Sequence, residues 1–192
     1  MYKSTKMKHN LHLLTTRLLM SLFVLFASTG VWATDDIGTI AWNINGYYEI
    51  DSEEDLQALA HYVNGTSDNH SDNHPCDGLL FKLTRDITMT GTHTAIGTYQ
   101  HPFKGMFDGG GHTITNLTIT DGGYMRGLFG YLNCSSEKDQ NDNYYPVYVK
   151  NVTLQNCNLN GSYVGGIAGR VSSNAGNIVK IENCHVLNAN II

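Results

Sequence analysis

Three potential metal ligands gather in one polar segment of the sequence. His70, His74 and Cys76 lie close together, among several aspartates. Histidine and cysteine are the side chains that zinc prefers, and three of them can hold the ion. Their spacing matches no closed structural zinc site, and the composition is equally typical of a solvated loop. We therefore assign no metal-ligating residue and expect no cofactor.

Acidic residues that could do acid–base chemistry are Asp86, Asp108 and Asp121. A glycosidase needs two carboxyl groups held about 5–5.5 Å or 6.5–9.5 Å apart. Asp108 lies in Phe-Asp-Gly-Gly-Gly and Asp121 precedes Gly122-Gly123, where an aspartate accepts hydrogen bonds from its own turn. The glycines at 109–111 lack the lysine, the hydroxyl residue and the helix of a phosphate-binding loop. We predict turn acids, no catalytic or cofactor-binding residue and no enzyme activity.

The four cysteines allow three disulfide pairings, and the sequence does not choose between them. Cys76 and Cys134 lie in two loops, and we expect this pair to be oxidised if any is. Cys157 and Cys184 occupy strand positions that should face inward, where a free thiol packs as a small apolar group.

Tyrosines mark a polar insertion, Asn133 to Pro146, in the second half of the chain. Tyr144, Tyr145 and Tyr148 could stack on sugars or on a protein partner, because an aromatic ring offers an apolar face. The alternative is a loop whose tyrosines cover the neighbouring strand.

The N-terminal segment 1–33 has the pattern of a signal peptide. Four basic residues precede an apolar run at 18–27, which is too short to span a membrane. Val31-Trp32-Ala33 then supplies small residues at both specificity positions of a cleavage site. This segment holds four of the 12 basic and none of the 17 acidic residues, so the net charge of −5 becomes −9 on cleavage. Such an acidic chain is not expected to bind nucleic acid. An uncleaved N-terminal anchor is the alternative.

One helix is expected after a lead-in strand at 34–50. Ser52 is a helix N-cap, three acidic residues follow it, apolar residues recur at helical spacing, and Asn64-Gly65 is a stop signal. The pattern predicts a helix over about 52–64 that covers the open end of a strand array. A polar loop follows and completes an N-terminal region of 34–78.

A sequence pattern recurs from Leu79 to Ile192. Asn116–Ile119 resembles Asn151–Leu154 and Asn183–Val186, and Gly127–Gly130 resembles Gly166–Gly169. A period of roughly 30–40 residues is the mark of a repeat protein whose units bury their apolar faces against one another. Short β-rich runs separated by Gly and Asn predict an all-β solenoid, with Asn116, Asn151 and Asn183 forming a side-chain ladder at a corner.

The repeat register can be assigned from the last two units. Sliding Val149–Leu159 onto Ile181–Ile191, an offset of 32, aligns three asparagines and five apolar positions. An offset of 27 aligns fewer positions, so we prefer 32. At that offset the next Gly-rich strand would fall near position 198, beyond Ile192, and we expect the last coil to be incomplete.

The repeat is similar to a known family. Phe-x-Gly-x-Phe-Asp-Gly-x-Gly-His-Thr-Ile from Phe103, followed by Gly-Leu-Phe-Gly and Val-Gly-Gly-Ile-Ala-Gly, resembles the GLUG-motif repeat proteins. These are exported bacterial proteins, common in gut Bacteroidetes, whose repeat also occurs beside the protease domain of IgA-specific metallopeptidases. The resemblance implies a right-handed parallel β-helix that serves as stalk, spacer or binding surface. No His-Glu-x-x-His motif occurs here, so protease activity does not carry over.

These observations favour a secreted or cell-surface β-solenoid module without enzyme activity. Its expected role is that of an adhesin stalk or of a surface that binds a glycan or a host protein. The alternatives are a polysaccharide-degrading β-helix enzyme, or the N-terminal fragment of a larger secreted peptidase.

Overall fold

The computed structural model describes Ile37, residues 40–65 and residues 74–192. The predicted signal peptide lies outside the described residues. One helix and many short strands make up the described part, which confirms an all-β fold with a single helix. In chain order the elements are β1 (Ala41–Asn43), β2 (Tyr47–Ile50), α2 (Glu53–Asn64), β3 (Leu80–Leu83), β4 (Ile87–Thr88), β5 (Met106–Asp108), β6 (Thr113–Thr115), β7 (Thr118–Ile119), β8 (Tyr124–Arg126), β9 (Phe129–Asn133), β10 (Val147–Lys150), β11 (Thr153–Gln155), β12 (Asn158–Leu159), β13 (Ser162–Val164), β14 (Ala168–Ser172), β15 (Val179–Glu182), β16 (His185–Leu187) and β17 (Asn190–Ile191).

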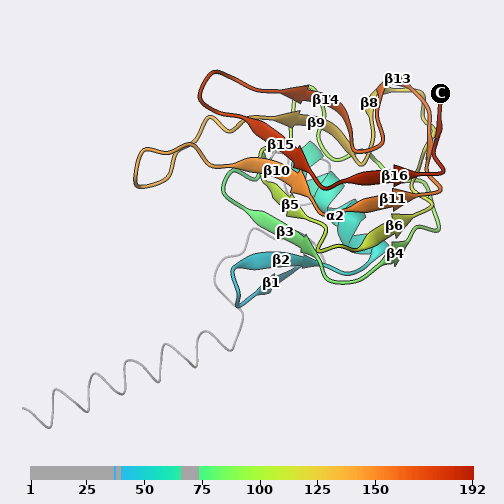
Figure 1. The fold of residues 1–192 in the computed structure, drawn as a ribbon, viewed down its shortest axis with the longest axis horizontal. Helices are drawn as coiled ribbons and strands as arrows, with labels where there is room; N and C mark the ends of the chain where they lie inside the picture. Colours follow the sequence, from blue (N-terminus) through green and yellow to red (C-terminus); the bar gives the residue numbers. More distant parts are fainter. Residues whose placement is uncertain (1–36, 38–39, 66–73) are drawn as a thin grey trace, which may run out of the picture. The chain divides into compact units, whose positions relative to one another are not determined.

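The strands are arranged in five small sheets. Their orders are β1-β2-β3-β5-β10-β15, β16-β11-β6-β4, β17-β12-β7, β13-β8 and β14-β9. Apart from the antiparallel pair β1–β2, all pairings between these strands are parallel. Strands far apart in the sequence therefore lie side by side, as β4, β6, β11 and β16 do in Figure 1.

The preferred repeat register is confirmed by the pairing of the last two units. Val149 pairs with Ile181, Leu154 with Val186 and Leu159 with Ile191. The preceding unit is longer, since Val149 pairs on its other side with Phe107. The insertion between β9 and β10 accounts for most of this greater length.

The predicted equivalence of Asn116–Ile119 with Asn151–Leu154 is wrong. Leu154 pairs with Ile114, and the Asn116 N–H donates to the Gln155 carbonyl, so Asn116 stands beside Asn156. Asn116, Asn151 and Asn156 all have left-handed backbone, with φ of 63°, 55° and 55°. Two different corners thus carry the same residue for the same reason, since asparagine tolerates this conformation.

The predicted ladder of Asn116, Asn151 and Asn183 forms only between Asn151 and Asn183; Asn116 lies at the other corner, where the Asn188 side chain donates to Asn156 at 3.5 Å. The Asn183 side chain donates to the Asn151 Oδ1 atom at 2.9 Å, and Asn151 in turn donates to Asp108 at 3.0 Å. Asn190 donates to Asn158 at 3.0 Å. These bonds join successive units outside the backbone ladders.

Apolar side chains at equivalent positions form columns inside the stack. Phe81, Phe107 and Val149 occupy one register position and are fully buried. This column ends at Ile181, which is 42% exposed. Parallel ladders keep equivalent residues about 4.8 Å apart, so each apolar side chain covers the one before it.

The lead-in is a hairpin rather than one strand. β1 and β2 pair antiparallel, and Gly46 has a φ of 87° in the turn between them. Tyr48 and Ile50 are buried as the alternation predicts, but Trp42 and Ile44 are exposed because the turn reverses the chain before β2 joins the sheet.

Helix α2 has the ends that the sequence predicts. The Asp55 N–H donates to the Ser52 hydroxyl at 3.2 Å, and Gly65 closes the helix in left-handed conformation with its N–H on the His61 carbonyl. The side chains of Leu56 and Leu59 are fully buried.

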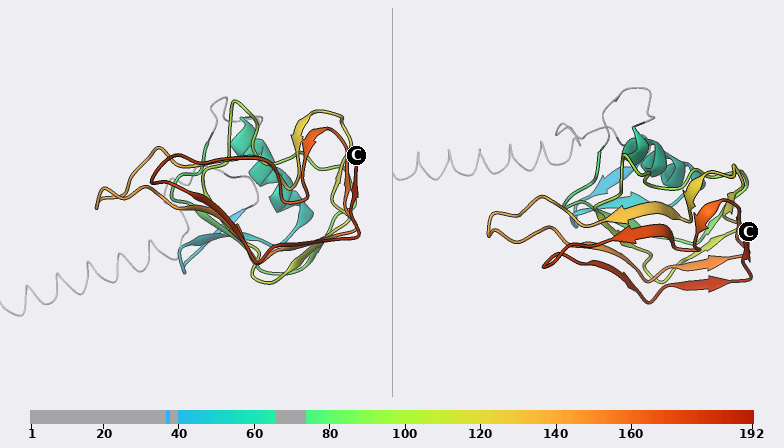
Figure 2. Two further views of the ribbon diagram at one scale, coloured as in Figure 1. Left: turned by 45° about the horizontal axis from the view of Figure 1, so that its top comes forward. Right: turned by 90° about the horizontal axis from the view of Figure 1, so that it is seen from above.

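Both ends of α2 are bonded to the first turn of the stack. The Glu53 carboxylate accepts hydrogen bonds from the Thr90 N–H at 2.8 Å and the Gly91 N–H at 3.0 Å. At the other end, the Asn64 side chain bonds the Ala95 carbonyl and the Gly97 N–H. The helix lies at the end of the stack opposite to β15 and β16 (Figure 2).

The repeated glycines are sites of close backbone approach. A Cβ atom on Gly169 would lie 2.6 Å from the Arg126 nitrogen, the Met125 carbonyl carbon and the Tyr163 oxygen. Gly130 occupies the equivalent place one unit earlier, and its Cβ would lie 2.8 Å from the Met125 oxygen. The second glycine of each Gly-x-x-Gly motif, Gly130 or Gly169, therefore lets the backbone near Met125 and Tyr163 pack directly against strands β9 and β14.

Replacing this glycine tests that packing. Gly169→Ala should lower the free energy of unfolding by about 1–3 kcal/mol, the usual cost of overpacking. Urea unfolding followed by circular dichroism measures the change. Gly91→Ala is the matched control, because a Cβ there makes only an ordinary contact at 3.5 Å and should change stability by less than about 0.5 kcal/mol. Equal effects of the two substitutions would contradict the assignment.

His93 is a buried titratable group between α2 and the stack. Its side chain is 4% exposed, and neither ring nitrogen has a hydrogen-bond partner among the described residues. Burial lowers the pKa of His93 to about 4; the charge of Glu53 opposes this shift and that of His61 adds to it. The neutral ring is therefore the form that the fold accommodates.

Acid should destabilise the protein through His93. The pKa of His93 is about 4 in the folded state and 6.5 in the unfolded state. The contribution of neutral His93 to the free energy of unfolding is therefore fully present above pH 6.5, and it is lost as the pH falls towards 4. The loss corresponds to about 3 kcal/mol. His93→Leu should remove this part of the pH dependence in urea titrations, whereas the exposed His185→Leu should retain it. An unchanged acid limb in His93→Leu would refute the assignment.

Candidate functional site

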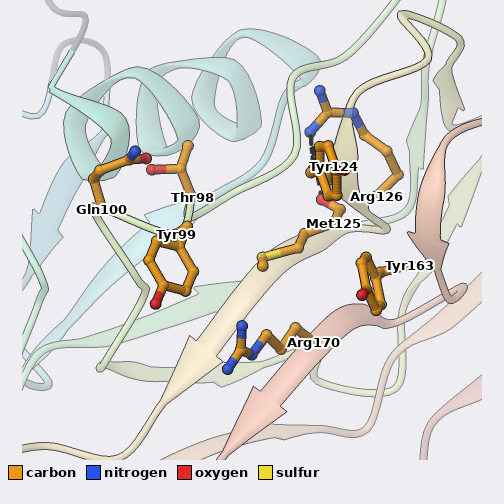
Figure 3. A pocket seen from close by; sticks show the side chains of 8 residues that line it. All are labelled: Thr98, Tyr99, Gln100, Tyr124, Met125, Arg126, Tyr163 and Arg170. Atoms are coloured by element: carbon orange, nitrogen blue, oxygen red, sulfur yellow. Dashed lines mark hydrogen bonds between the residues drawn. The ribbon is translucent and has the colours of Figure 1, made fainter.

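A cleft of about 830 Å³ opens on the side of the stack beside α2. This volume lies in the range of small-molecule sites. Tyrosine and arginine side chains dominate its lining, and Figure 3 shows them around Met125. The described lining residues are Thr98, Tyr99, Gln100, Tyr124, Met125, Arg126, Tyr163 and Arg170.

One side of the cleft is a row of side chains from three successive turns. The rings of Tyr99 and Tyr131 are stacked, with centroids 6.2 Å apart. Arg170 pairs with Tyr131 in the β9–β14 ladder, and its guanidinium lies 5.0 Å from the Tyr131 ring and 5.4 Å from the Tyr99 ring. Cation–π attraction to two rings holds the guanidinium in place.

The loop that carries Tyr99 is fixed by α2. The Asn64 side chain bonds residues 95 and 97, and the Asn64 carbonyl lies 2.7 Å from the His101 ring. The Thr98 N–H donates to the His101 carbonyl, which closes the loop on itself. The C-terminal end of α2 therefore determines where Tyr99 stands.

The other side of the cleft is a pair of exposed tyrosines. Tyr124 on β8 and Tyr163 on β13 have stacked rings with centroids 6.0 Å apart, and they are 70% and 67% exposed. The ladder register places Tyr163 beside Met125, and both have a φ of 56°. Left-handed backbone at such large residues costs about 1–3 kcal/mol and is concentrated at functional sites.

Hydrogen bonds from Arg126 fix the backbone segment that carries Tyr124. Its guanidinium makes two bonds to the Asp121 carboxylate, at 2.6 and 2.8 Å, and donates to the Tyr124 carbonyl at 2.6 Å. Partial burial raises the pKa of Asp121, but the bonds from Arg126 and Gly123 outweigh it and the net shift is downward. The charge of Arg126 is thus neutralised inside the protein.

Arg170 is the unneutralised cation of the cleft. Among the described residues it has aromatic partners but no carboxylate partner. No carboxylate belongs to the described lining of the cleft. The cleft therefore combines aromatic faces with one available guanidinium, which can donate two parallel hydrogen bonds.

Of the three predicted turn acids, Asp108 and Asp121 accept hydrogen bonds from the turns that follow them, whereas Asp86 bonds a neighbouring segment. Asp108 accepts from the Gly110 N–H and the Asn151 side chain, at 3.0 Å each. Asp86 accepts from the Thr113 N–H at 2.9 Å and lies 3.1 Å from the His112 ring. The Thr113 bond is the main cause that lowers the pKa of Asp86, and hydrogen bonds also outweigh burial at Asp108, so its pKa is lowered too. Neither carboxyl has the raised pKa of a general acid.

The potential metal ligands are only partly within the described residues. His70 lies outside them. His74 stacks on the Tyr62 ring at 4.2 Å, and the Cys76 thiol bonds the His74 carbonyl at 3.3 Å. No group of three or more His, Cys, Asp or Glu side chains able to hold a metal is found in the part of the chain that the structure describes.

All four cysteines are free thiols, so the expected Cys76–Cys134 disulfide is not formed. Cys76, Cys134 and Cys157 are buried, whereas Cys184 is only partly buried because it lies in the last unit. Burial raises the pKa of the thiols of Cys76, Cys157 and Cys184.

The tyrosines of the insertion are engaged within the protein. Tyr145 packs against Gly78, and lysines lie over the rings of Tyr144 at 4.8 Å and Tyr148 at 4.7 Å. The tyrosines of the cleft were not singled out by the sequence pattern. A signal was present, since Tyr124 and Tyr163 each lie just before a Gly-x-x-Gly motif, at the same distance from it.

Comparison with known proteins gives one partial likeness. The chain is 33% identical to halomucin of Haloquadratum walsbyi in an alignment 146 residues long, which covers 68% of this chain and 1% of halomucin. The chain thus spans about a hundredth of the curated relative it matches. No family model and no solved structure matches the chain. Within the described residues, no helix has the length and apolar character needed to cross a membrane.

Alkylation should distinguish the cysteines. In the native protein iodoacetamide should label Cys184 first, because it is partly exposed whereas the other three thiols are buried out of reach of the reagent. In denaturant without reductant, mass spectrometry should find four labels. Two labels in place of four would reveal a disulfide and contradict the free-thiol assignment.

Proposed function

We propose that this chain is an exported or cell-surface module without enzyme activity that binds glycans through the tyrosine–arginine cleft. The observation that carries the proposal is the stacked, exposed pair Tyr124–Tyr163 across the cleft from Arg170. Sugar rings bind to aromatic faces through their apolar C–H surfaces, and polar groups at the rim, such as the Gln100 amide, satisfy hydroxyl groups.

We further propose that the stack is a right-handed parallel β-solenoid of the GLUG type. The repeated parallel register supports this, since the five strands β10–β14 pair in order with the five strands β5–β9 of the preceding unit. Parallel strands of one sheet are connected with right-handed crossovers in about 98% of cases. The glycine motifs that carry the resemblance lie at the close contacts of the stack.

Export is supported by the sequence pattern of residues 1–33 and by the likeness to halomucin, whose name denotes a mucin-type protein. The absence of enzyme activity is supported by Asp86, Asp108 and Asp121, each of which accepts hydrogen bonds and has a lowered pKa. A glycosidase site would instead pair a carboxyl group of raised pKa with one of ordinary pKa.

Removing the tyrosine pair tests the proposal. On a glycan array the protein should bind a defined set of glycans, and Tyr124→Ala and Tyr163→Ala should each raise the Kd about tenfold, because truncating an aromatic anchor costs more than about 1 kcal/mol. Isothermal titration calorimetry on the array hits measures this change.

Tyr144→Ala is the matched control, since this ring lies on the insertion loop away from the cleft lining and should leave the Kd unchanged. An array without any hit would leave a stalk or spacer role. Turnover of a polysaccharide by this protein would replace the proposal with the enzyme alternative.

A further inference from the structure

The charge of the cleft differs from that of the chain as a whole. The net charge is −5, yet the described lining holds two arginines and no acid. Asp121 neutralises Arg126 through both carboxylate oxygens, so Arg170 alone is left to attract an anion. At physiological ionic strength charges more than about 8 Å away are largely screened, so this local cation outweighs the acidic background.

The guanidinium of Arg170 is preorganised for recognition. Its contacts with Tyr99 and Tyr131 restrict the side chain, and among the described residues its N–H donors make no hydrogen bond. The Tyr131 hydroxyl is itself bonded to Ser172 at 3.0 Å, which fixes the ring beneath the cation. A planar guanidinium held in this way binds a carboxylate, which accepts two parallel hydrogen bonds, better than it binds a neutral hydroxyl group.

The aromatic pair and the guanidinium line one cleft. Figure 3 shows Tyr124 and Tyr163 to the right of Met125, Tyr99 to its left and Arg170 below it. Met125 is 7% exposed and supplies an apolar floor. A ligand that fills the cleft would therefore meet an aromatic face and a cation together.

We infer that the cleft selects carboxylated glycans, with a sugar ring against Tyr124 and Tyr163 and the carboxylate of that sugar or of its neighbour on Arg170. This inference rests on the proposed glycan binding and names its ligand class. The partner chemistry is a hexuronic or nonulosonic acid within a longer glycan.

Matched pairs of acidic and neutral ligands test the inference. The probes are tetragalacturonate and its methyl ester, a hyaluronan oligosaccharide and its methyl ester, and sialyllactose and lactose. At least one acidic member should bind at least tenfold more tightly than its neutral partner in calorimetry, since hydrogen bonds to a charged group contribute about 1.5–3 kcal/mol. Added sodium chloride should weaken that binding.

Variants of Arg170 identify the group responsible. Arg170→Gln should abolish the preference for the acidic ligand, while weak binding of the neutral ligand persists. Arg170→Lys should retain part of this preference, because lysine keeps the positive charge but cannot donate two parallel hydrogen bonds to a carboxylate. Lys180→Gln removes an exposed charge elsewhere and should keep the full preference. Urea unfolding of each variant checks that the fold is intact.

The outcomes separate the two proposals. Glycan-array hits that bind without any acid preference, or a preference that survives in Arg170→Gln, would overturn this inference and leave glycan binding standing. No binding of any array glycan or probe would overturn both.

Discussion

Everything in this structure depends on stacking equivalent strands in parallel register. A ladder fixes the distance between units at about 4.8 Å, so each unit must supply an apolar side chain that fits over the one before it. Phe81, Phe107 and Val149 satisfy this condition in one column, and Ile114 and Leu154 in another. The chain must also turn sharply at the end of each short strand, and left-handed corners are the means of doing so. Asparagine and glycine recur because those corners accept few other residues.

The corner within β8, with its counterpart within β13, departs from that rule and lines the cleft. Met125 and Tyr163 adopt left-handed backbone although neither is Asn or Gly. Their conformational cost is offset by the parallel β8–β13 pairing, by the Arg126–Asp121 clamp and by glycines that let the corner lie against the next strand. Strain that the surrounding contacts enforce in this way presents two large rings to solvent at a fixed place.

Sequence patterns predicted the parts of the fold that depend on local chemistry. The helix ends follow from Ser52 and Gly65, and the register of the last two units follows from the alternation of apolar residues between β10 and β17. The earlier alignment failed because Asn116 and Asn151 satisfy the same backbone requirement at different corners, and a corner signal carries no information on which corner it is. The cleft could not be predicted, because Tyr99, Tyr124 and Arg170 come from three separate turns and meet only through the ladder register. The pair Cys76–Cys134 was favoured as a disulfide because both residues lie in loops, and a place in a loop does not determine whether two thiols meet.

A change in register explains why the tyrosine pair is available for binding. Between the unit β5–β9 and the unit β10–β14, paired residues lie further apart in the sequence at β7–β12, where Thr118 meets Asn158, than at β8–β13, where Tyr124 meets Ser162. The β9–β14 ladder lies between these two values, and extending its register back to β8 would set Tyr163 directly beside Tyr124 at the ladder spacing, where the two rings would cover one another. The shift instead sets Tyr163 beside Met125, and the rings are displaced to a centroid separation of 6.0 Å with most of each exposed. The change of register at β8–β13 thus leaves the faces of Tyr124 and Tyr163 exposed, where they can contact a ligand. The β7–β12 and β9–β14 ladders on either side keep the stack intact.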